Sequence, residues 1–196
     1  VSVVTVVFNG EDFIEETIRN VLNQTYDNIE YIIVDGGSTD NTINIIKKYE
    51  KDISYFISEK DNGIYDAMNK GIDLATGKWI NFMNAGDVFY KNTTIEDIFK
   101  ESESFDDAEV LYGDLIVDYG TFQRFEKARN ISSMWKGMVF SHQSSFIRST
   151  YHKEYKYSLN YKIGGDFEFF YKTYKRKKIF QYINCTISIM GVEGLS

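Results

Sequence analysis

The sequence is short of cysteine and of positive charge, and each shortage excludes a class of protein. Its 196 residues contain one cysteine, Cys185, so no disulfide can form within the chain, which favours a reducing, cytoplasmic location. The formal net charge is −7. A nucleic acid partner is therefore not expected, because binding to phosphate backbones needs a basic surface. Proline is absent, and we have no physical explanation for its absence.

Long apolar segments and a glycine-rich phosphate loop are also missing. No run approaches the roughly 18 apolar residues that span a bilayer, and no basic and apolar leader precedes the first predicted strand, so we expect neither a membrane span nor a signal peptide. Residues 8–13 read FNGEDF, where a dinucleotide-binding dehydrogenase requires G-x-G-x-x-G. A nicotinamide dehydrogenase is therefore disfavoured.

What remains is typical of one globular domain, with 43% hydrophobic and 26% charged residues and no linker or repeat. In the first half, β-branched apolar runs alternate with segments of helical periodicity, which predicts a doubly wound α/β sheet. Asp12 with Glu15, and Thr93 with Glu96, have the spacing of helix capping boxes. The predicted strands are Val1–Phe8, Ile29–Asp35, Ile53–Ser58 and Lys78–Met83, and the predicted helices cover about 14–22, 41–51, 64–75 and 93–104.

After about Val110 the pattern changes. Residues 111–119 and 121–125 read as a hairpin joined at Tyr119-Gly120, and 138–148 as a loop that leads into a strand. A helix is predicted from Asp166 to about Arg176, and a strand over 179–190. The second half is therefore expected to add antiparallel strands to the same sheet.

Asp35 closes the apolar strand IEYIIVD, at a position where open α/β sheets bind ligands. Its carboxylate can accept hydrogen bonds from a nucleotide base or a ribose hydroxyl. Thr5, Phe8 and Asn9 lie at the neighbouring strand end and are placed to frame that base. The alternative is that Asp35 only caps the following turn.

The loop after the next strand, Met83–Asp87, has the composition of a phosphate and metal site. Asn84, Ala85 and Gly86 are small, so a diphosphate and a cation can approach the backbone closely. Mg²⁺-like ions take oxygen ligands, often one or two carboxylates together with phosphate oxygens. Asp87 is the candidate carboxylate, and the alternative is an aspartate that caps a turn.

Asp166 follows Gly164-Gly165 at the start of a predicted helix. It is a candidate general base beside an acceptor, although favourable interaction with the helix dipole would also explain it. Glu168 is a second candidate, but it faces another side of the helix. His142, in the polar loop FSHQSSF, is a candidate metal or substrate ligand, with a structural role as the alternative. The basic run Lys172–Lys178 is either a solvated helix end or a contact with an anionic membrane surface or lipid phosphate.

Five segments, in this order, resemble the family 2 glycosyltransferases of the GT-A fold, and the subtype resembles bacterial enzymes that build capsule, O-antigen or exopolysaccharide units. The resemblance implies a single GT-A domain over 1–196. In it, a Rossmann-like mixed sheet flanked by helices would bind the nucleotide-sugar (1–109), and antiparallel additions would bind the acceptor (110–196). The segments are SVVTVVFNGEDFIEETIRNVLNQTY, IIVDGGSTDNT, EKDNGIYDAMNKGIDLATGKWINFMNAGD, SHQSSFIR and GGDFEFF.

The resemblance also implies residue roles. Asp35 would read the base, Asp66 would lie near the nucleotide-sugar, Asp87 would be the last acid of the DxD metal motif, and Asp166 would be the catalytic base. The chain departs from the family pattern at Asn84 and Gly86, where many members have aspartates, and at Met68, where many have an arginine. One clear carboxylate is thus left in the metal loop.

The resulting hypothesis is an inverting, metal-dependent glycosyltransferase that uses Mn²⁺ or Mg²⁺ and a nucleotide-diphosphate sugar, with UDP as the expected nucleotide. Its acceptor would be a saccharide or lipid-linked saccharide, and its location the cytoplasm or, peripherally, the inner face of the plasma membrane. The alternative is a non-catalytic nucleotide-sugar or glycan-binding module derived from a transferase.

Overall fold

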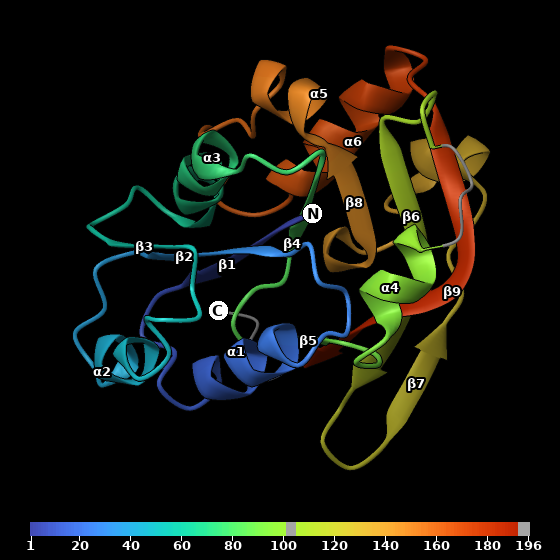
Figure 1. The fold of residues 1–196 in the computed structure, drawn as a ribbon. Coiled ribbons are helices and arrows are strands. Elements are labelled where there is room, and N and C mark those ends of the chain that lie inside the picture. Colours follow the sequence, from blue (N-terminus) through green and yellow to red (C-terminus); the bar gives the residue numbers. More distant parts are fainter. Residues whose placement is uncertain (101–104, 192–196) are drawn as a thin grey trace.

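Among the residues that the structure describes, nine strands form one continuous sheet (Figure 1). The computed structural model describes residues 1–100 and 105–191. The first four strands pair with one another in parallel, in the order β3-β2-β1-β4. They are β1 (Ser2–Val7), β2 (Glu30–Asp35), β3 (Tyr55–Ser58) and β4 (Trp79–Phe82). Each end of these four strands lies within two residues of the predicted end.

Beyond β4 the sheet continues in the order β8-β6-β9-β5, with β7 paired to β6, so that β5 of the first half lies antiparallel to β9 at the far edge. β8 is antiparallel to both β4 and β6, and β6 and β7 form the expected hairpin. β9 runs parallel to β6 instead, because the chain passes through β7, β8 and two α-helices before it returns beside β6. The strands are β5 (Asp87–Phe89), β6 (Val110–Asp118), β7 (Gln123–Glu126), β8 (Ser145–Arg148) and β9 (Phe180–Gly191).

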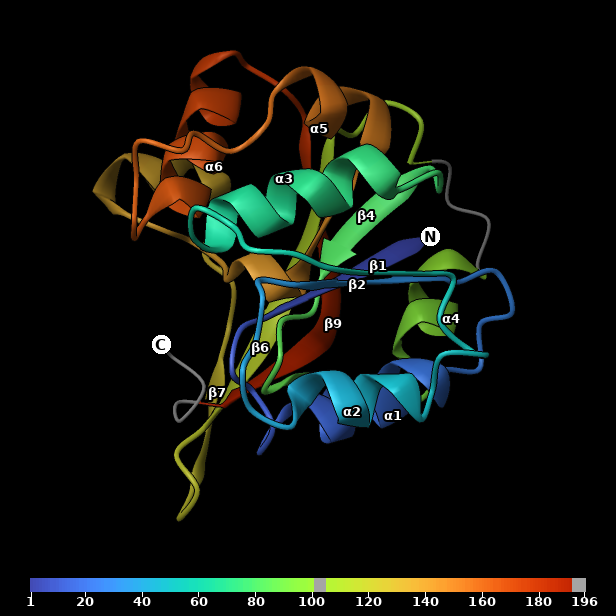
Figure 2. The same ribbon diagram turned by 90° about the vertical axis from the view of Figure 1, so that its left-hand side faces the viewer.

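Helices cover both faces of the sheet (Figure 2). On one face lie α1 (Ile14–Leu22), α2 (Thr42–Lys47) and α4 (Thr94–Phe99). On the other lie α3 (Ile64–Leu74), α5 (Ser149–Glu154) and α6 (Gly165–Lys175). Two short 3₁₀ helices, η1 (Ile131–Lys136) and η2 (His142–Ser144), lie in the second half.

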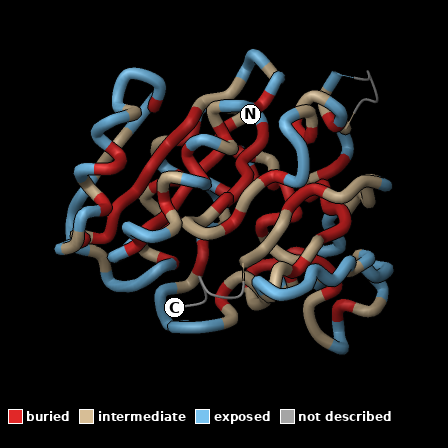
Figure 3. Tube along the Cα trace, turned by 90° about the horizontal axis from the view of Figure 1, so that it is seen from below, coloured by how far each residue is buried: buried red, intermediate tan, exposed pale blue. Residues whose placement is uncertain are grey.

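The sheet separates two apolar cores, one under each layer of helices. All six residues of β1 are buried, as expected for a central parallel strand covered on both faces (Figure 3). On the α3 side the helix packs so closely that a β-carbon at Gly71 would lie 2.4 Å from a Val4 methyl group. The parallel pairing of β1 with β2 and with β4 places the carboxyl ends of all three strands at one edge.

The helix starts differ from the predicted capping boxes. α1 begins at Ile14 without a side-chain cap, because Glu15 instead accepts hydrogen bonds from Arg19 and Tyr49. At α4, the Thr93 hydroxyl donates to the Asp97 side chain instead of capping the helix. The end predicted for that helix, near residue 104, lies outside the described residues. Over the described ranges, every helix is too short or too polar to cross a membrane.

Candidate functional site

Two loops meet at the carboxyl edge of β1 and β2. The backbone N–H of Asn9 donates to Ser38 Oγ at 2.7 Å, and Asn9 Oδ1 accepts from the Thr39 N–H at 2.9 Å. Asn9 has a left-handed backbone, with φ of 48°, which the contact with Thr39 helps to hold. Phe8, next to it, is 60% exposed although it follows a wholly buried strand. The edge therefore presents an aromatic ring beside a rigid polar turn.

Asp35 lies in this turn and is fully buried. Its Oδ2 accepts hydrogen bonds from the N–H groups of Gly37 and Ser38, both at 3.1 Å, and from the Ser58 hydroxyl at 2.6 Å. Oδ1 has one longer contact, 3.4 Å from the Ser38 N–H. The carboxylate thus shapes the turn, as the capping alternative proposed, and Oδ1 retains most of its capacity to accept.

Two other predicted nucleotide-binding residues are occupied within the protein. Thr5 is fully buried in the middle of β1, where its hydroxyl donates to the Met83 carbonyl at 2.7 Å. The structure does not bring Thr5 to the edge. Asp66 accepts hydrogen bonds from the backbone and side chain of Asn62 at 2.9 and 3.2 Å, and therefore orders the turn that begins α3.

The loop between β4 and β5 forms a tight turn closed by a 2.9 Å hydrogen bond from the Asp87 N–H to the Asn84 carbonyl. Gly86 has a φ of 94°, a conformation that a residue with a β-carbon adopts only with strain. An aspartate in its place would be disfavoured, which gives a physical reason for the departure from the family pattern. Ala85 is half-buried and packs against the α1 side of the core.

Asp87, the first residue of β5, is 7% exposed. Its Oδ1 accepts a hydrogen bond from Gln143 Nε2 at 3.3 Å. Burial raises the pKa of Asp87 from 3.8 to about 6, although the nearby His142 and the Gln143 amide oppose the rise. An ionised Asp87 at neutral pH therefore favours a cation beside it.

His142 connects the β4–β5 loop to Asp166. Its Nε2 lies 3.2 Å from Asn84 Nδ2, and its Nδ1 lies 3.5 Å from Asp166 Oδ2. With Asn84 donating to Nε2, the proton of a neutral imidazole lies on Nδ1 and points to Asp166, a tautomer assigned from these contacts. His142 was predicted as a metal or substrate ligand, and here both ring nitrogens already have protein partners.

Asp166 is held from two sides. The Tyr65 hydroxyl lies 3.2 Å from Oδ1 and itself accepts a hydrogen bond from the Gly165 N–H at 2.8 Å. Burial alone would raise the pKa of Asp166, but His142, the Phe167 N–H and Tyr65 outweigh burial, so the pKa is lowered. The carboxyl is therefore ionised at neutral pH, as a proton acceptor must be. Glu168, the alternative candidate, forms an ion pair with Lys172.

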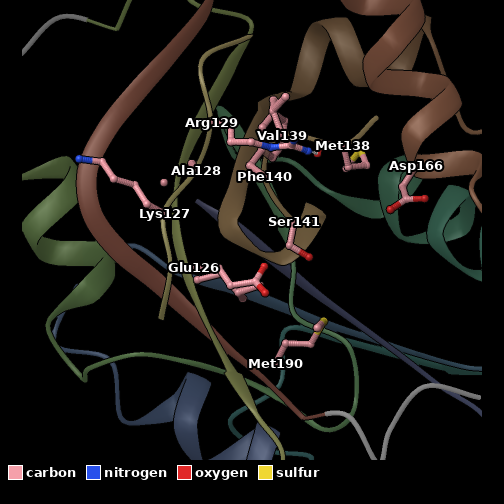
Figure 4. Close-up of a pocket in the computed structure, with 12 residues that line it drawn as sticks. Glu126, Lys127, Ala128, Arg129, Met138, Val139, Phe140, Ser141, Asp166 and Met190 are labelled. Carbon is pink, nitrogen blue, oxygen red and sulfur yellow. Dashed lines mark hydrogen bonds between the residues drawn. The ribbon is translucent and has the colours of Figure 1, made fainter. Parts of the chain in front are cut away.

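A cavity of about 530 Å³ opens beside Asp166 (Figure 4). The Asp166 carboxylate lies at one side of this cavity, and the Glu126 carboxylate and the Ser141 hydroxyl face its centre, whereas the Lys127 amine points away. Met138 and Met190 supply apolar walls. A polar molecule with several hydroxyl groups could lie here with one hydroxyl close to Asp166.

The oxygen donors of the β4–β5 loop suit a hard divalent cation only in part. Among residues 1–100 and 105–191, no group of three or more acidic, histidine or cysteine side chains could hold a metal by itself. Asn84 Oδ1, however, is buried without a hydrogen-bond partner in the described structure, and it belongs to the same turn as the buried Asp87. One carboxylate and one amide oxygen fit a cation whose other ligands are phosphate oxygens and water.

Sequence reasoning missed two residues of this site. Tyr65 and Gln143 orient Asp166 and Asp87 respectively, and neither lies next to its partner in the sequence. For Gln143 the neighbouring His142 was a usable signal. For Tyr65 no local pattern separates it from the apolar face of its helix.

Sequence comparison places the chain in a known family. The profile of "Glycosyl transferase family 2" matches residues 2–181. A "PGL/p-HBAD biosynthesis glycosyltransferase" of Mycobacterium bovis is 28% identical over 172 residues, which cover 86% of this chain and 67% of the relative. An "uncharacterized glycosyltransferase" of Mycobacterium tuberculosis is 41% identical over 90 residues, 45% of this chain and 34% of that protein.

Solved structures show the same fold at low identity. S. aureus TarS 1-349 in complex with UDP superposes with a TM-score of 0.78 and 19% identity, over 97% of this chain and 60% of that one. The mannosyltransferase PcManGT from Pyrobaculum calidifontis, in complex with GDP-Man and Mn²⁺, gives 0.76 and 15%, over 100% and 57%. The chain thus spans about three fifths of the length of these structures. The predicted GT-A fold is confirmed, and the chain belongs to glycosyl transferase family 2.

Proposed function

We propose that this chain moves a sugar from a nucleotide-diphosphate donor, with UDP as the nucleotide, to an acceptor hydroxyl with inversion at the anomeric carbon. The observation that carries the proposal is the position of Asp166. It is an ionised carboxylate at the side of a cavity, joined through His142 to the loop that follows β4. The acceptor is proposed to be a saccharide or lipid-linked saccharide used in cell-surface polysaccharide synthesis.

The donor nucleotide is proposed to bind at the carboxyl edge of β1 and β2. Exposed Phe8 offers a stacking surface for a base. Asn9 and the buried Asp35 hold the adjoining turn, and Asp35 Oδ1 has capacity left for a donor on the base or ribose. Solved TarS structures contain UDP or UDP-GlcNAc, which supports UDP as the nucleotide here.

The diphosphate is proposed to lie over Asn84, Ala85 and Gly86. Asp87, with the Asn84 side-chain oxygen, would hold a Mn²⁺ or Mg²⁺ ion, and PcManGT was solved with Mn²⁺. When bound, the cation offsets negative charge on the departing nucleotide diphosphate. The Asn84 oxygen, which has no hydrogen-bond partner among the described residues, and the raised pKa of Asp87 both support a cation at this position.

Transfer then requires a base on the acceptor side. Asp166 accepts the proton of the acceptor hydroxyl, and the oxygen attacks the anomeric carbon on the face opposite the leaving group. His142 and Tyr65 orient the carboxylate during this step. A single carboxylate reacts with substrate, whereas a glycoside hydrolase needs two that flank the bond. In this proposal residues 1–109 hold the donor and residues 110–196 hold the acceptor.

A non-catalytic nucleotide-sugar or glycan-binding module remains the second candidate, because the metal loop has one carboxylate. A thermal-shift screen of nucleotide sugars with and without Mn²⁺ tests binding, and release of UDP separates the two candidates. A donor at about 100 times its dissociation constant should stabilise the fold by about 2.7 kcal/mol. Asp87→Asn is the matched control and should lose the Mn²⁺-dependent part. Absence of any shift with the donor would contradict donor binding, and a shift that Mn²⁺ does not increase would contradict the proposed cation. Binding without turnover would favour the module.

A further inference from the structure

The loop between α5 and α6, residues 155–164, exposes apolar side chains in succession. Leu159 is 56% exposed, Tyr161 43% and Ile163 91%. All five residues from 159 to 163 are exposed. A single exposed apolar residue is ordinary in a folded protein, but a run that combines aliphatic and aromatic side chains marks a contact surface.

This loop is anchored at both ends to helix α3. The Asn69 side chain donates to the Tyr157 carbonyl at 2.9 Å and accepts from the Tyr157 N–H at 3.0 Å. At the other end, the Gly165 N–H donates to the Tyr65 hydroxyl at 2.8 Å. The apolar residues between these anchors are therefore presented to solvent by a held loop, and they are not part of a loose end.

The charge of the chain is unevenly distributed, and the loop lies in the basic half. Residues 110–196 contain 13 lysines and arginines against 7 aspartates and glutamates, whereas residues 1–109 contain 9 against 22. Net charge is thus +6 in one half and −13 in the other, which gives the total of −7. An anionic partner is favoured at the second half and repelled at the first.

Several cations on the loop and on the two helices that flank it are uncommitted. Lys162 lies in the loop, Lys153 on α5, and Lys175 and Lys177 at the end of α6, and within the described ranges none of the four forms an ion pair. Other lysines there are neutralised, since Lys156 pairs with Asp73 and Lys172 with Glu168. α5, the loop and α6 lie on the same side of the sheet (Figures 1 and 2).

We propose that residues 159–163, together with Lys153, Lys162, Lys175 and Lys177, form a docking surface for an anionic lipid bilayer. Leu159, Tyr161 and Ile163 would enter the headgroup region, and the lysines would pair with lipid phosphates. The loop runs directly into Asp166, three residues after Ile163. If the proposed transferase function holds, docking brings the base to the membrane surface, where a lipid-linked acceptor presents its saccharide.

Co-flotation with vesicles tests the surface without any donor or acceptor. The purified chain is mixed with phosphatidylcholine vesicles, with and without phosphatidylglycerol, at low and high salt. The apolar test variant is Leu159→Ser with Ile163→Ser, and its control is Phe125→Ser, which removes a 57% exposed aromatic ring on β7. The charge test variant is Lys162→Glu with Lys175→Glu, and its control is Lys47→Glu with Lys51→Glu near α2, on the opposite face.

The unaltered chain should bind the anionic vesicles only, and high salt should weaken binding. One lysine beside an anionic surface is worth about fivefold in partitioning, and burial of one aliphatic side chain about tenfold or more, so each test variant should lose at least tenfold. Both controls should bind like the unaltered chain. The substituted side chains are exposed, so every variant is expected to fold like the unaltered chain. The unfolding temperature of each variant checks this.

Three results would overturn the proposal. Equal binding to neutral and anionic vesicles, or none to either, excludes an anionic bilayer. A change of mass in light scattering that Ile163→Ser abolishes would assign the surface to a second copy of the chain. Normal vesicle binding by Leu159→Ser with Ile163→Ser, but a raised KM for a water-soluble acceptor, would make the loop part of the acceptor site. A negative UDP titration would refute the transferase function and leave the vesicle result unaffected.

Discussion

Replacement of Asp87 by asparagine should stabilise the metal-free protein at neutral pH. The carboxyl is 7% exposed, and burial raises its pKa from 3.8 to about 6. Between these two pH values the folded state holds a proton that the unfolded state has released. Folding stability therefore falls as pH rises from about 4 to 6, and above 6 the loss is complete.

The size of this effect follows from the two pKa values. At about 1.4 kcal/mol for each pKa unit, an ionised Asp87 destabilises the folded protein by about 3 kcal/mol above pH 6. Between pH 4 and pH 7.5 the difference in unfolding free energy between Asp87→Asn and the unaltered protein should grow by about 2 kcal/mol. Any fixed contribution of the new amide group cancels in this comparison, as do titrations common to both proteins.

Urea unfolding at a series of pH values in the presence of a chelator measures this difference. Mn²⁺ with UDP should reverse the order at pH 7.5, since only the carboxylate gains from the cation. A difference between the two proteins that stays constant from pH 4 to pH 7.5 would refute the reasoning, because it would mean that Asp87 does not titrate in this range.

Three further predictions concern the carboxyl edge of β1 and β2, the β4–β5 loop and the core. Asp35→Ala removes the acceptor of the Ser38 N–H and the Ser58 hydroxyl, so the unfolding free energy measured in urea should fall by about 2 kcal/mol or more. Asp35→Asn should keep the fold and weaken UDP binding in calorimetry. Unchanged stability of the alanine variant would contradict this role. Asn84→Asp should tighten Mn²⁺ binding about tenfold, because it adds a carboxylate. Gly86→Asp should destabilise the fold, because position 86 has a φ of 94°. Equal effects of the two variants in a Mn²⁺ titration would be inconsistent with the turn described. His152 is fully buried, and burial lowers its pKa to about 3. Protonation of this histidine in the unfolded chain should therefore remove about 2 kcal/mol of folding stability between pH 7.5 and pH 5, and His152→Phe should not show this loss. A parallel pH dependence of the two proteins would exclude His152 as the source.

The parts of the fold that sequence predicts well are those with strong local patterns. β1 and β2 are largely apolar runs with a turn after each, so their positions and the acid that ends β2 could be predicted directly. The capping boxes were wrong because a tertiary contact competes with the local one, as when Tyr49 takes the Glu15 carboxylate at α1. The direction of β9 was not predictable from its own residues, since it depends on the path of the chain between β6 and β9.

Several residues of the candidate site could be proposed from the sequence one by one, but Tyr65, Gln143 and the contacts between the site residues could not. Asp166 and Tyr65 are 101 residues apart, and Asn84 and His142 are 58 apart, so no spacing along the chain reveals these contacts. Burial also changed the interpretation of individual residues. Thr5 lies inside the sheet, and Asp35 is largely used by its own turn, which only the packed structure shows.

The central claim is that Asp166 is the base of a glycosyl transfer, and the most direct test compares Asp166→Asn with the unaltered protein. The amide keeps the shape of the side chain and removes its basicity. UDP and Mn²⁺ should bind to both proteins alike in calorimetry, while transfer to a true acceptor, followed as UDP release, should fall by roughly 10² to 10⁴-fold in the variant. Glu168→Gln should be the milder change. Near-normal turnover in Asp166→Asn would contradict the assignment of the base.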